Sequence, residues 1–362
     1  MTSRKSNLRS GVLWLVALGM VLVPAVANLR AERPQPSANG RAASSGDSGT
    51  FCTDTAEALL TACVFQAQND LYVARAICIN ESDAVDRAAC FQDADDSLAE
   101  AQDLCRGQHD TRLLACASLG EGRYDPEFDA SQFESRFTKL THPNPYFPLT
   151  IGYRWVYKGG TEKDTVEITN ATKLIDGVTC IVVHDVVLDR GLLKEDTNDW
   201  YAQAKNGDVW YCGEEAKDYE NFAGDRPVIP ELVSDEGSFK AGREGDKPGI
   251  IFLALPSAGK TYVEEASLAN AEDVTDILST TYSYGTDPEL DRYVPRRLAE
   301  LFCSSRDCVV TRNYSLLEPG IFDRKFYARG VGVFLEVHLN TADSDQLVAC
   351  NFDPRCAQLP IH

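Results

Sequence analysis

The sequence predicts an α+β protein: a small helical hairpin held by a ladder of disulfides, followed by a larger antiparallel β-sheet domain with a curved sheet or half-barrel. Two observations predict this fold class. Six closely spaced cysteines, from Cys52 to Cys116, lie among helix-forming residues. After residue 148 the chain consists mainly of short strand signals with turn residues between them. The predicted parts are a signal peptide (1–27), a flexible linker (28–50), the cysteine-rich helical module (51–120), a second linker (121–147), the β domain (148–349) and a disulfide-tethered tail (350–362).

The first 27 residues have the pattern of a secretory signal peptide. Basic residues precede an apolar run over 11–26, and Ala25-Val26-Ala27 offers the small residues of a cleavage site. The run is shorter than the ~20 residues of a membrane span, and an uncleaved anchor is the alternative. Residues 28–50 are rich in Ala, Ser, Gly and Pro, which is typical of a flexible tether. We therefore expect the protein to be secreted or periplasmic.

The net charge of −20 excludes two classes of partner. Removal of Arg4, Lys5 and Arg9 with the signal peptide leaves the mature chain at −23. A chain this acidic repels nucleic acid phosphates and anionic lipid headgroups, so we expect no nucleic acid and no membrane surface as partner. A small molecule or another protein remains as the expected ligand.

The twelve cysteines predict disulfides, because export delivers the chain to an oxidising compartment and no pair has the C-x2-C spacing of zinc sites. The first six are separated by 11, 15, 12, 15 and 11 residues, a palindrome. Fifteen helical residues span about 22 Å, too far for a disulfide within one helix. Two antiparallel helices would instead form nested pairs: Cys52–Cys116, Cys63–Cys105 and Cys78–Cys90.

The alternative to nested pairs is local pairing of Cys52 with Cys63 and of Cys105 with Cys116, which requires both helices to break. Ser82 and Asp83 are the expected caps of the second helix. For the β domain the expected pairs are Cys180–Cys212, Cys303–Cys308 and Cys350–Cys356.

Several strands of the β domain can be placed from their patterns. Residues 178–188 are apolar on both faces over much of their length, which predicts a central strand. Residues 331–339 alternate between apolar and other residues, which predicts a half-buried strand with one face inward. A short helix is expected within residues 291–302.

A hairpin is predicted at Asn206-Gly207, between strands over 199–203 and 209–214. With a two-residue turn, Asp199 lies opposite Glu214, and the same register pairs Tyr201 with Cys212 and Gln203 with Trp210. A three-residue loop with a glycine bulge would shift this register and separate the two carboxylates.

Like charges directly opposite each other destabilise a sheet. The predicted pair is therefore solvated at the rim of an acidic protein, or shares a proton, or holds a cation between its carboxylates. A protonated member would be a general acid with a raised pKa, and a cation would indicate an oxygen-ligand calcium site. The candidate ligand or metal residues are Glu195, Asp199, Tyr201, Trp210 and Glu214. No cofactor is predicted apart from calcium at this place.

No catalytic residue is predicted, because the sequence has no H-E-x-x-H zinc pattern and no G-x-S-x-G nucleophile elbow. Three functional hypotheses remain. The preferred one is a non-enzymatic ligand-binding or structural module, with the helical ladder as a spacer. The second is a secreted hydrolase using carboxylates drawn from Glu195, Asp199, Glu214, Glu265 and Glu272. The third is a calcium-stabilised interaction domain with the same acidic residues.

Two sets of residues resemble an uncharacterised family of secreted bacterial proteins. The first is Phe147-Pro148-Leu149 followed by Gly152, Trp155 and Tyr157. The second is Asp199-Trp200-Tyr201-Ala202-Gln203, then Gly207, Val209-Trp210-Tyr211 and Gly213-Glu214. The similarity covers about residues 143–337 and departs from the family at residues 303–308 and at the tail. No activity is known for that family, so the resemblance supports the predicted fold and implies no chemistry.

Overall fold

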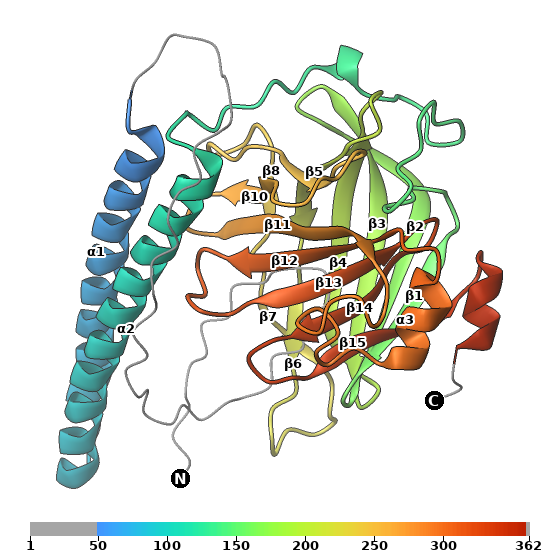
Figure 1. The fold of residues 1–362 in the computed structure, drawn as a ribbon. Coiled ribbons are helices and arrows are strands. Elements are labelled where there is room, and N and C mark those ends of the chain that lie inside the picture. Colours follow the sequence, from blue (N-terminus) through green and yellow to red (C-terminus); the bar gives the residue numbers. More distant parts are fainter. Residues whose placement is uncertain (1–48, 360–362) are drawn as a thin grey trace.

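The computed structural model describes residues 49–359, so the predicted signal peptide, nearly all of the first linker and the last three residues of the tail lie outside the described residues. A hairpin of two long helices stands beside a large antiparallel sheet (Figure 1). This arrangement confirms the predicted fold class. Within residues 49–359, no helix is both long enough and apolar enough to span a membrane.

The hairpin consists of α1 (Phe51–Ile79) and α2 (Ala84–Leu119). Of the two expected caps, Asp83 accepts hydrogen bonds from the amides of Val85 and Asp86 at 2.7 and 3.1 Å. Few side chains of the two helices are buried, and most of them are alanines or bridged cysteines: Ala56, Ala67, Leu71, Cys78, Ala94, Cys105, Arg112, Ala115 and Cys116. So small an apolar interface contributes little hydrophobic stabilisation, and the disulfides compensate for it.

Three nested disulfides join the two helices, with Cα–Cα distances between 5.5 and 5.7 Å. They are the pairs that the palindromic spacing predicts, and the local pairing is wrong because both helices continue unbroken through their cysteines. The other three disulfides also have the predicted partners. Cys180–Cys212 joins strands β3 and β5, Cys303–Cys308 joins helix α3 to strand β12, and Cys350–Cys356 joins strand β15 to the tail.

The sheet has fifteen strands in the order β10-β11-β12-β13-β14-β15-β1-β2-β3-β4-β5-β8, with β6, β7 and β9 paired beside this path. The strands are β1 (Arg154–Gly159), β2 (Glu162–Ile175), β3 (Val178–Asp189), β4 (Leu192–Gln203), β5 (Val209–Glu215), β6 (Asp218–Glu220), β7 (Glu231–Ser234), β8 (Phe239–Lys240), β9 (Gly249–Phe252), β10 (Thr261–Ser267), β11 (Ala271–Tyr282), β12 (Cys308–Ser315), β13 (Asp323–Ala328), β14 (Gly332–His338) and β15 (Ser344–Cys350). The short helices are η1 (Ala130–Gln132), α3 (Arg296–Cys303) and η2 (Pro354–Gln358).

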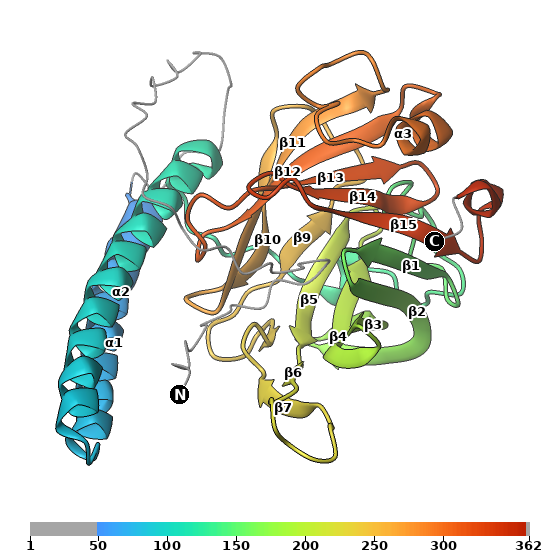
Figure 2. The same cartoon turned by 90° about the horizontal axis from the view of Figure 1, so that it is seen from below.

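The sheet is strongly curved but not closed. Strand β9 pairs with β5 near one end of the strand order and also contacts β10 at the other end. Strands β10–β15 therefore lie across from β2–β5, as Figures 1 and 2 show, and one face of the sheet is turned inward. We call the space enclosed by this face the sheet interior. Phe147 and Leu149, from the segment before β1, belong to the main hydrophobic core.

Two strand predictions have opposite outcomes. The central position of residues 178–188 is confirmed, because β3 lies between β2 and β4. The strand predicted at 331–339 is present as β14, but its predicted half-burial is wrong, because every residue of β14 is buried. Helix α3 overlaps the predicted helical segment and ends one residue beyond it. It covers the outer face of the sheet, where Phe302 packs against Phe334 with ring centroids 5.0 Å apart. The inward side of β14 carries Glu336.

A buried ion pair attaches the hairpin to the sheet. Arg112 of α2 donates from Nε and Nη2 to the two carboxylate oxygens of Glu272 on β11, at 2.9 and 2.7 Å. Beside it, Gln108 donates to the carbonyl of Leu317 at 2.9 Å, and after the hairpin the Tyr124 hydroxyl donates to the carbonyl of Pro248 at 2.9 Å. A bidentate pair fixes orientation as well as distance. The hairpin therefore has a defined position at this end, whereas its turn extends away from the sheet (Figures 1 and 2).

Candidate functional site

Carboxylates line a large part of the sheet interior. Nine of them are at most 5% exposed: Asp164, Asp185, Asp199, Glu214, Glu264, Glu265, Asp273, Glu336 and Asp345. Among the described residues, seven of these nine have a carboxylate oxygen without a hydrogen-bond partner, the exceptions being Glu264 and Asp345. Lys325 and His338 are buried among the same group. Buried carboxylates in such excess over cations require protons or bound cations, because an unpaired buried charge is strongly unfavourable.

The structure brings four of the five predicted candidates to this interior. Asp199 and Glu214 are 0% and 2% exposed and lie directly opposite each other on β4 and β5, as predicted. The solvated alternative for this pair is therefore wrong. Tyr201 stacks on Tyr211 in the main core, and half-buried Glu195 accepts a hydrogen bond from Thr197 at 3.0 Å. The fifth candidate, Trp210, lies in the separate cluster with Phe133 and Phe128.

The register of this hairpin combines both of the alternatives that the sequence left open. Next to the turn, Tyr201 pairs with Tyr211 and Gln203 with Val209, so the predicted pairs with Cys212 and Trp210 are wrong. A bulge then adds one residue on β5, after which Trp200 pairs with Gly213 and Asp199 with Glu214. The bulge restores the two-carboxylate pair that the glycine-containing loop would otherwise separate.

Gly213 makes this bulge possible, and we expect Gly213→Ala to destabilise the fold more than any ordinary glycine substitution. Its φ is +131°, and a Cβ would stand 2.2 Å from the carbonyl oxygen of Phe239. The matched control is Gly177→Ala, at φ +81° with no atom within 4 Å of the added Cβ, which measures backbone strain alone. Urea unfolding should give a loss of about 1 kcal/mol for the control and at least ~2 kcal/mol more for Gly213→Ala. Equal losses would contradict the close approach of β8.

Burial raises the pKa of the interior carboxyls. It raises the pKa of Asp164 to about 7 and that of Asp273 to about 8. Burial likewise raises the pKa values of Asp185, Asp199, Glu214 and Glu265 well above the usual range, and neighbouring carboxylates add to the effect. The Tyr211 hydroxyl donates to Oδ1 of Asp199 at 2.5 Å, which opposes the shift at that residue. Without bound cations, much of this cluster is therefore protonated at neutral pH.

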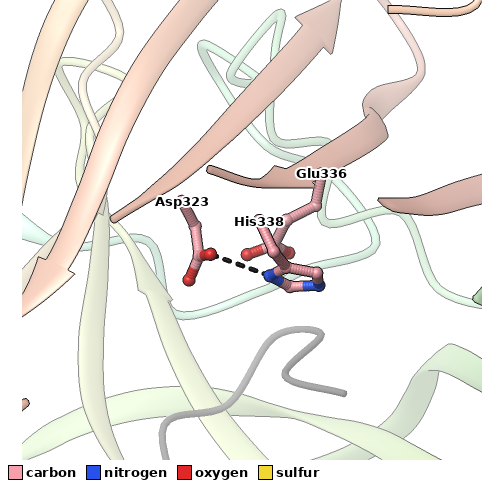
Figure 3. Close-up of side chains that lie close together, drawn as sticks. All are labelled: Asp323, Glu336 and His338. Carbon is pink, nitrogen blue, oxygen red and sulfur yellow. Dashed lines mark hydrogen bonds and ion pairs between the residues drawn. The ribbon is translucent and has the colours of Figure 1, made fainter. Parts of the chain in front are cut away.

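A second cluster, at the edge formed by β13, β14 and β15, has a different composition. His338 Nδ1 is 2.8 Å from Oδ1 of Asp323, and its Nε2 is 2.8 Å from Oδ2 of Asp345. Figure 3 shows the Glu336 carboxylate beside the Asp323 carboxylate and the His338 ring. Burial lowers the pKa of His338, but the hydrogen bonds to Asp323 and Asp345 outweigh it and raise the pKa to about 11. Sequence reasoning missed this cluster because it placed the apolar side of β14 inward.

The void described within the sheet interior is too small for an organic substrate. The void bordered by Glu264, Lys325 and Glu336 measures about 10 Å³, roughly the volume that a single water needs. Asp199, Glu214 and Glu265 are each at most 2% exposed. Such burial does not favour the hydrolase hypothesis, because a substrate must reach both carboxylates. The fifth hydrolase candidate, Glu272, lies on the other side of the sheet and pairs with Arg112.

A cleft of ligand size lies elsewhere, between the open end of the hairpin and strands β9–β11. Its volume is about 990 Å³. We call it the hairpin cleft, and its lining is mainly apolar, including Phe51, Leu59, Leu119, Ile250, Leu253 and Leu268. Arg112, itself 4% exposed, lines the cleft, and its buried Nη1 has no hydrogen-bond partner among the described residues. The sequence contained no signal for this cleft, because its walls come from distant segments.

Comparison with known proteins adds no assignment. No protein-family model, no curated protein and no solved structure matches this chain. The resemblance to secreted bacterial proteins therefore stays a prediction, and the functional argument depends on the geometry of the two clusters and of the hairpin cleft.

Proposed function

We propose that this chain is an exported, non-enzymatic binding protein that holds an amphipathic small molecule in the hairpin cleft. The observation that carries the proposal is the combination of an apolar cleft of about 990 Å³ with the buried, unpartnered Nη1 of Arg112. Binding sites for small molecules typically measure about 300–1,000 Å³ and combine an apolar lining with a few convergent polar groups.

The polar group indicates the chemistry of the ligand. Arg112 already neutralises Glu272, so its third nitrogen is available to donate to an oxygen acceptor inside an apolar wall. A carboxylate or carbonyl on an aliphatic body, as in a fatty acid, satisfies this donor and fills the remaining volume. Both walls are held in place before binding, by Cys52–Cys116 and by the ion pair, which lowers the entropic cost of association.

Export is part of the proposal. Six disulfides use all of the cysteines and are typical of proteins that fold in an oxidising compartment. The signal peptide pattern at residues 1–27 supports delivery to the periplasm or beyond the cell. In that setting the helical ladder acts both as a spacer and as one wall of the cleft.

The decisive experiment is titration with dansyl-undecanoic acid, a fluorescent fatty acid, followed by displacement with unlabelled oleic acid. Ala58→Trp places a large side chain in the cleft from an exposed helical position, and we expect it to weaken binding at least tenfold. Ala76→Trp is the matched control, also exposed on α1 but near the free end of the hairpin, and it should bind normally. Equal affinity in both variants, or no binding by the natural chain, would refute the cleft as the site.

Arg112→Lys tests the polar contact separately. Lysine keeps a positive charge beside Glu272 but cannot donate to both of its oxygens and to a ligand in the same fork geometry. We expect the preference for oleic acid over oleyl alcohol to fall about tenfold, since a charged hydrogen bond contributes about 1.5–3 kcal/mol. An unchanged preference would show that the acid group lies away from Arg112.

A further inference from the structure

We propose that Asp323, Glu336 and His338 bind a single first-row divalent metal ion of the zinc or manganese type. The site is independent of the hairpin cleft, since none of its three residues lines that cleft. One ligand atom from each of the three residues can be chosen so that all three atoms lie within 4.8 Å of one another.

Pairing of β13 with β14 brings the three ligands together. Asp323 lies directly opposite His338, and Glu336 is two residues before His338 on the same strand, so both side chains point to the same face. The Nδ1 of His338 and Oδ1 of Asp323 are 2.8 Å apart. Two ligand atoms on one tetrahedral zinc ion, each about 2.0–2.2 Å from the metal, stand about 3.4 Å apart, so little movement is needed.

Glu336 supplies the independent sign that a ligand belongs there. It is 1% exposed, and neither of its carboxylate oxygens has a hydrogen-bond partner among the described residues. The ammonium of Lys325 stands 4.0 Å away, which is beyond hydrogen-bond distance. Figure 3 shows its carboxylate directed toward Asp323 and His338.

Asp345 completes the arrangement from the neighbouring strand. Its Oδ2 is 2.8 Å from Nε2 of His338, the ring nitrogen on the side away from Asp323. Histidines that bind metals usually donate the other ring N–H to a carboxylate, which fixes the tautomer and the ring orientation. Asp345 is therefore a positioning residue, and His338 presents Nδ1 to the metal.

The charges of the cluster fit a divalent ion. Asp323, Glu336 and Asp345 carry three negative charges, and Lys325 supplies one positive charge. A metal ion at Nδ1 of His338 displaces the proton from that nitrogen and leaves the ring neutral, and one divalent ion then neutralises the two remaining negative charges. The imidazole nitrogen favours zinc or manganese over calcium, which prefers an all-oxygen set. Asp323 is half-buried and His338 is 8% exposed. These two residues lie at the edge of the cluster, where an ion can enter.

The test uses the full mature chain produced in an oxidising compartment and stripped with EDTA. Isothermal titration with Zn²⁺ and Mn²⁺ should show one ion per chain, and Ca²⁺ at the same concentration should not compete. Co²⁺ should give a visible absorption band that Zn²⁺ abolishes, a readout of the ligands themselves. No uptake of Zn²⁺ or Mn²⁺ would overturn the proposal, as would tighter binding of Ca²⁺.

The variants locate the site. Glu336→Gln and Asp323→Asn should each weaken metal binding at least tenfold, and Asp345→Asn should weaken it about 10–100-fold by releasing the ring of His338. Asp323→Asn guards against a folding defect, since Asp323 is the least buried ligand, and each variant is checked for native circular dichroism. Glu167→Gln, an exposed residue of β2, is the matched control and should bind normally. Loss of binding in Glu214→Gln with normal binding in Glu336→Gln would place the ion at the other carboxylate cluster and overturn the assignment.

Discussion

Without bound metal, the protein should be markedly more stable at pH 5 than at pH 8. Asp164 and Asp273 are buried, with pKa values raised to about 7 and about 8. In the unfolded chain an aspartate has a pKa of about 3.9. Between these limits the folded state binds more protons than the unfolded state, so the free energy of unfolding falls as the pH rises.

The expected size follows from the same linkage. Each such proton contributes about 1.4 kcal/mol per pH unit, between about pH 4 and pH 7 for Asp164 and between about pH 4 and pH 8 for Asp273. Above these values the contribution is constant. Together the two residues lower the free energy of unfolding by several kcal/mol between pH 5 and pH 7, which is a large part of the stability of an ordinary domain.

Asp273→Asn isolates one of these protons. Asparagine keeps the shape of the side chain but takes up no proton, so the variant should lose about 1.4 kcal/mol per pH unit of slope between about pH 4 and pH 8. Urea unfolding in EDTA at half-unit intervals of pH measures the difference, with Glu167→Gln as an exposed control of unchanged slope. Parallel curves for Asp273→Asn and the natural chain would show that Asp273 is ionised in the fold. In that case calcium, added in place of EDTA, is the next test. Bound calcium would be the better explanation for the interior carboxylates if it stabilised the natural chain but not Asp273→Asn.

The sequence predicted the covalent framework well because that framework depends on local geometry. A helix rises by a fixed distance per residue, so the spacing of Cys52, Cys63 and Cys78 determines which partners they can reach. The Asn206-Gly207 turn likewise limited Asp199 to two registers. Both inferences required only the chain near the residues concerned.

The sheet interior was not predictable for a physical reason. Alternation along a strand shows which residues share a face, but not which face is inward when the interior is itself polar. On β14 the apolar alternation suggested that Glu336 and His338 face water, and the curvature of the sheet places them inside with Lys325. The hairpin cleft escaped for a related reason, because it exists only where α1 and α2 meet strands β9–β11.

Removing the outer rung of the ladder, with Cys52→Ala and Cys116→Ala, should abolish ligand binding while the sheet stays folded. This disulfide holds the first turns of α1 against the last turns of α2, where Phe51 and Leu119 line the hairpin cleft. Between the middle rung, Cys63–Cys105, and the open end of the hairpin, the helices bury little apart from Ala56, Arg112 and Ala115. Little apolar burial therefore opposes fraying of this end once the outer disulfide is gone. The loss of one such disulfide costs about 3 kcal/mol of stability, which is more than the apolar burial at the open end of the hairpin supplies.

The inner rung provides the comparison by position, because Cys78→Ala with Cys90→Ala removes a disulfide at the end that extends away from the sheet. Hydrogen exchange should rise over residues 51–62 in the outer-rung variant and around the hairpin turn in the inner-rung variant. Binding of dansyl-undecanoic acid should be lost only in the first. Retained binding there would mean that the ion pair of Arg112 with Glu272 and the middle rung, Cys63–Cys105, together suffice to keep the cleft in shape. If binding is instead lost only in the outer-rung variant, the position of a rung, rather than the number of rungs, decides whether the cleft exists. Only the outer rung connects the two helices where they meet the sheet.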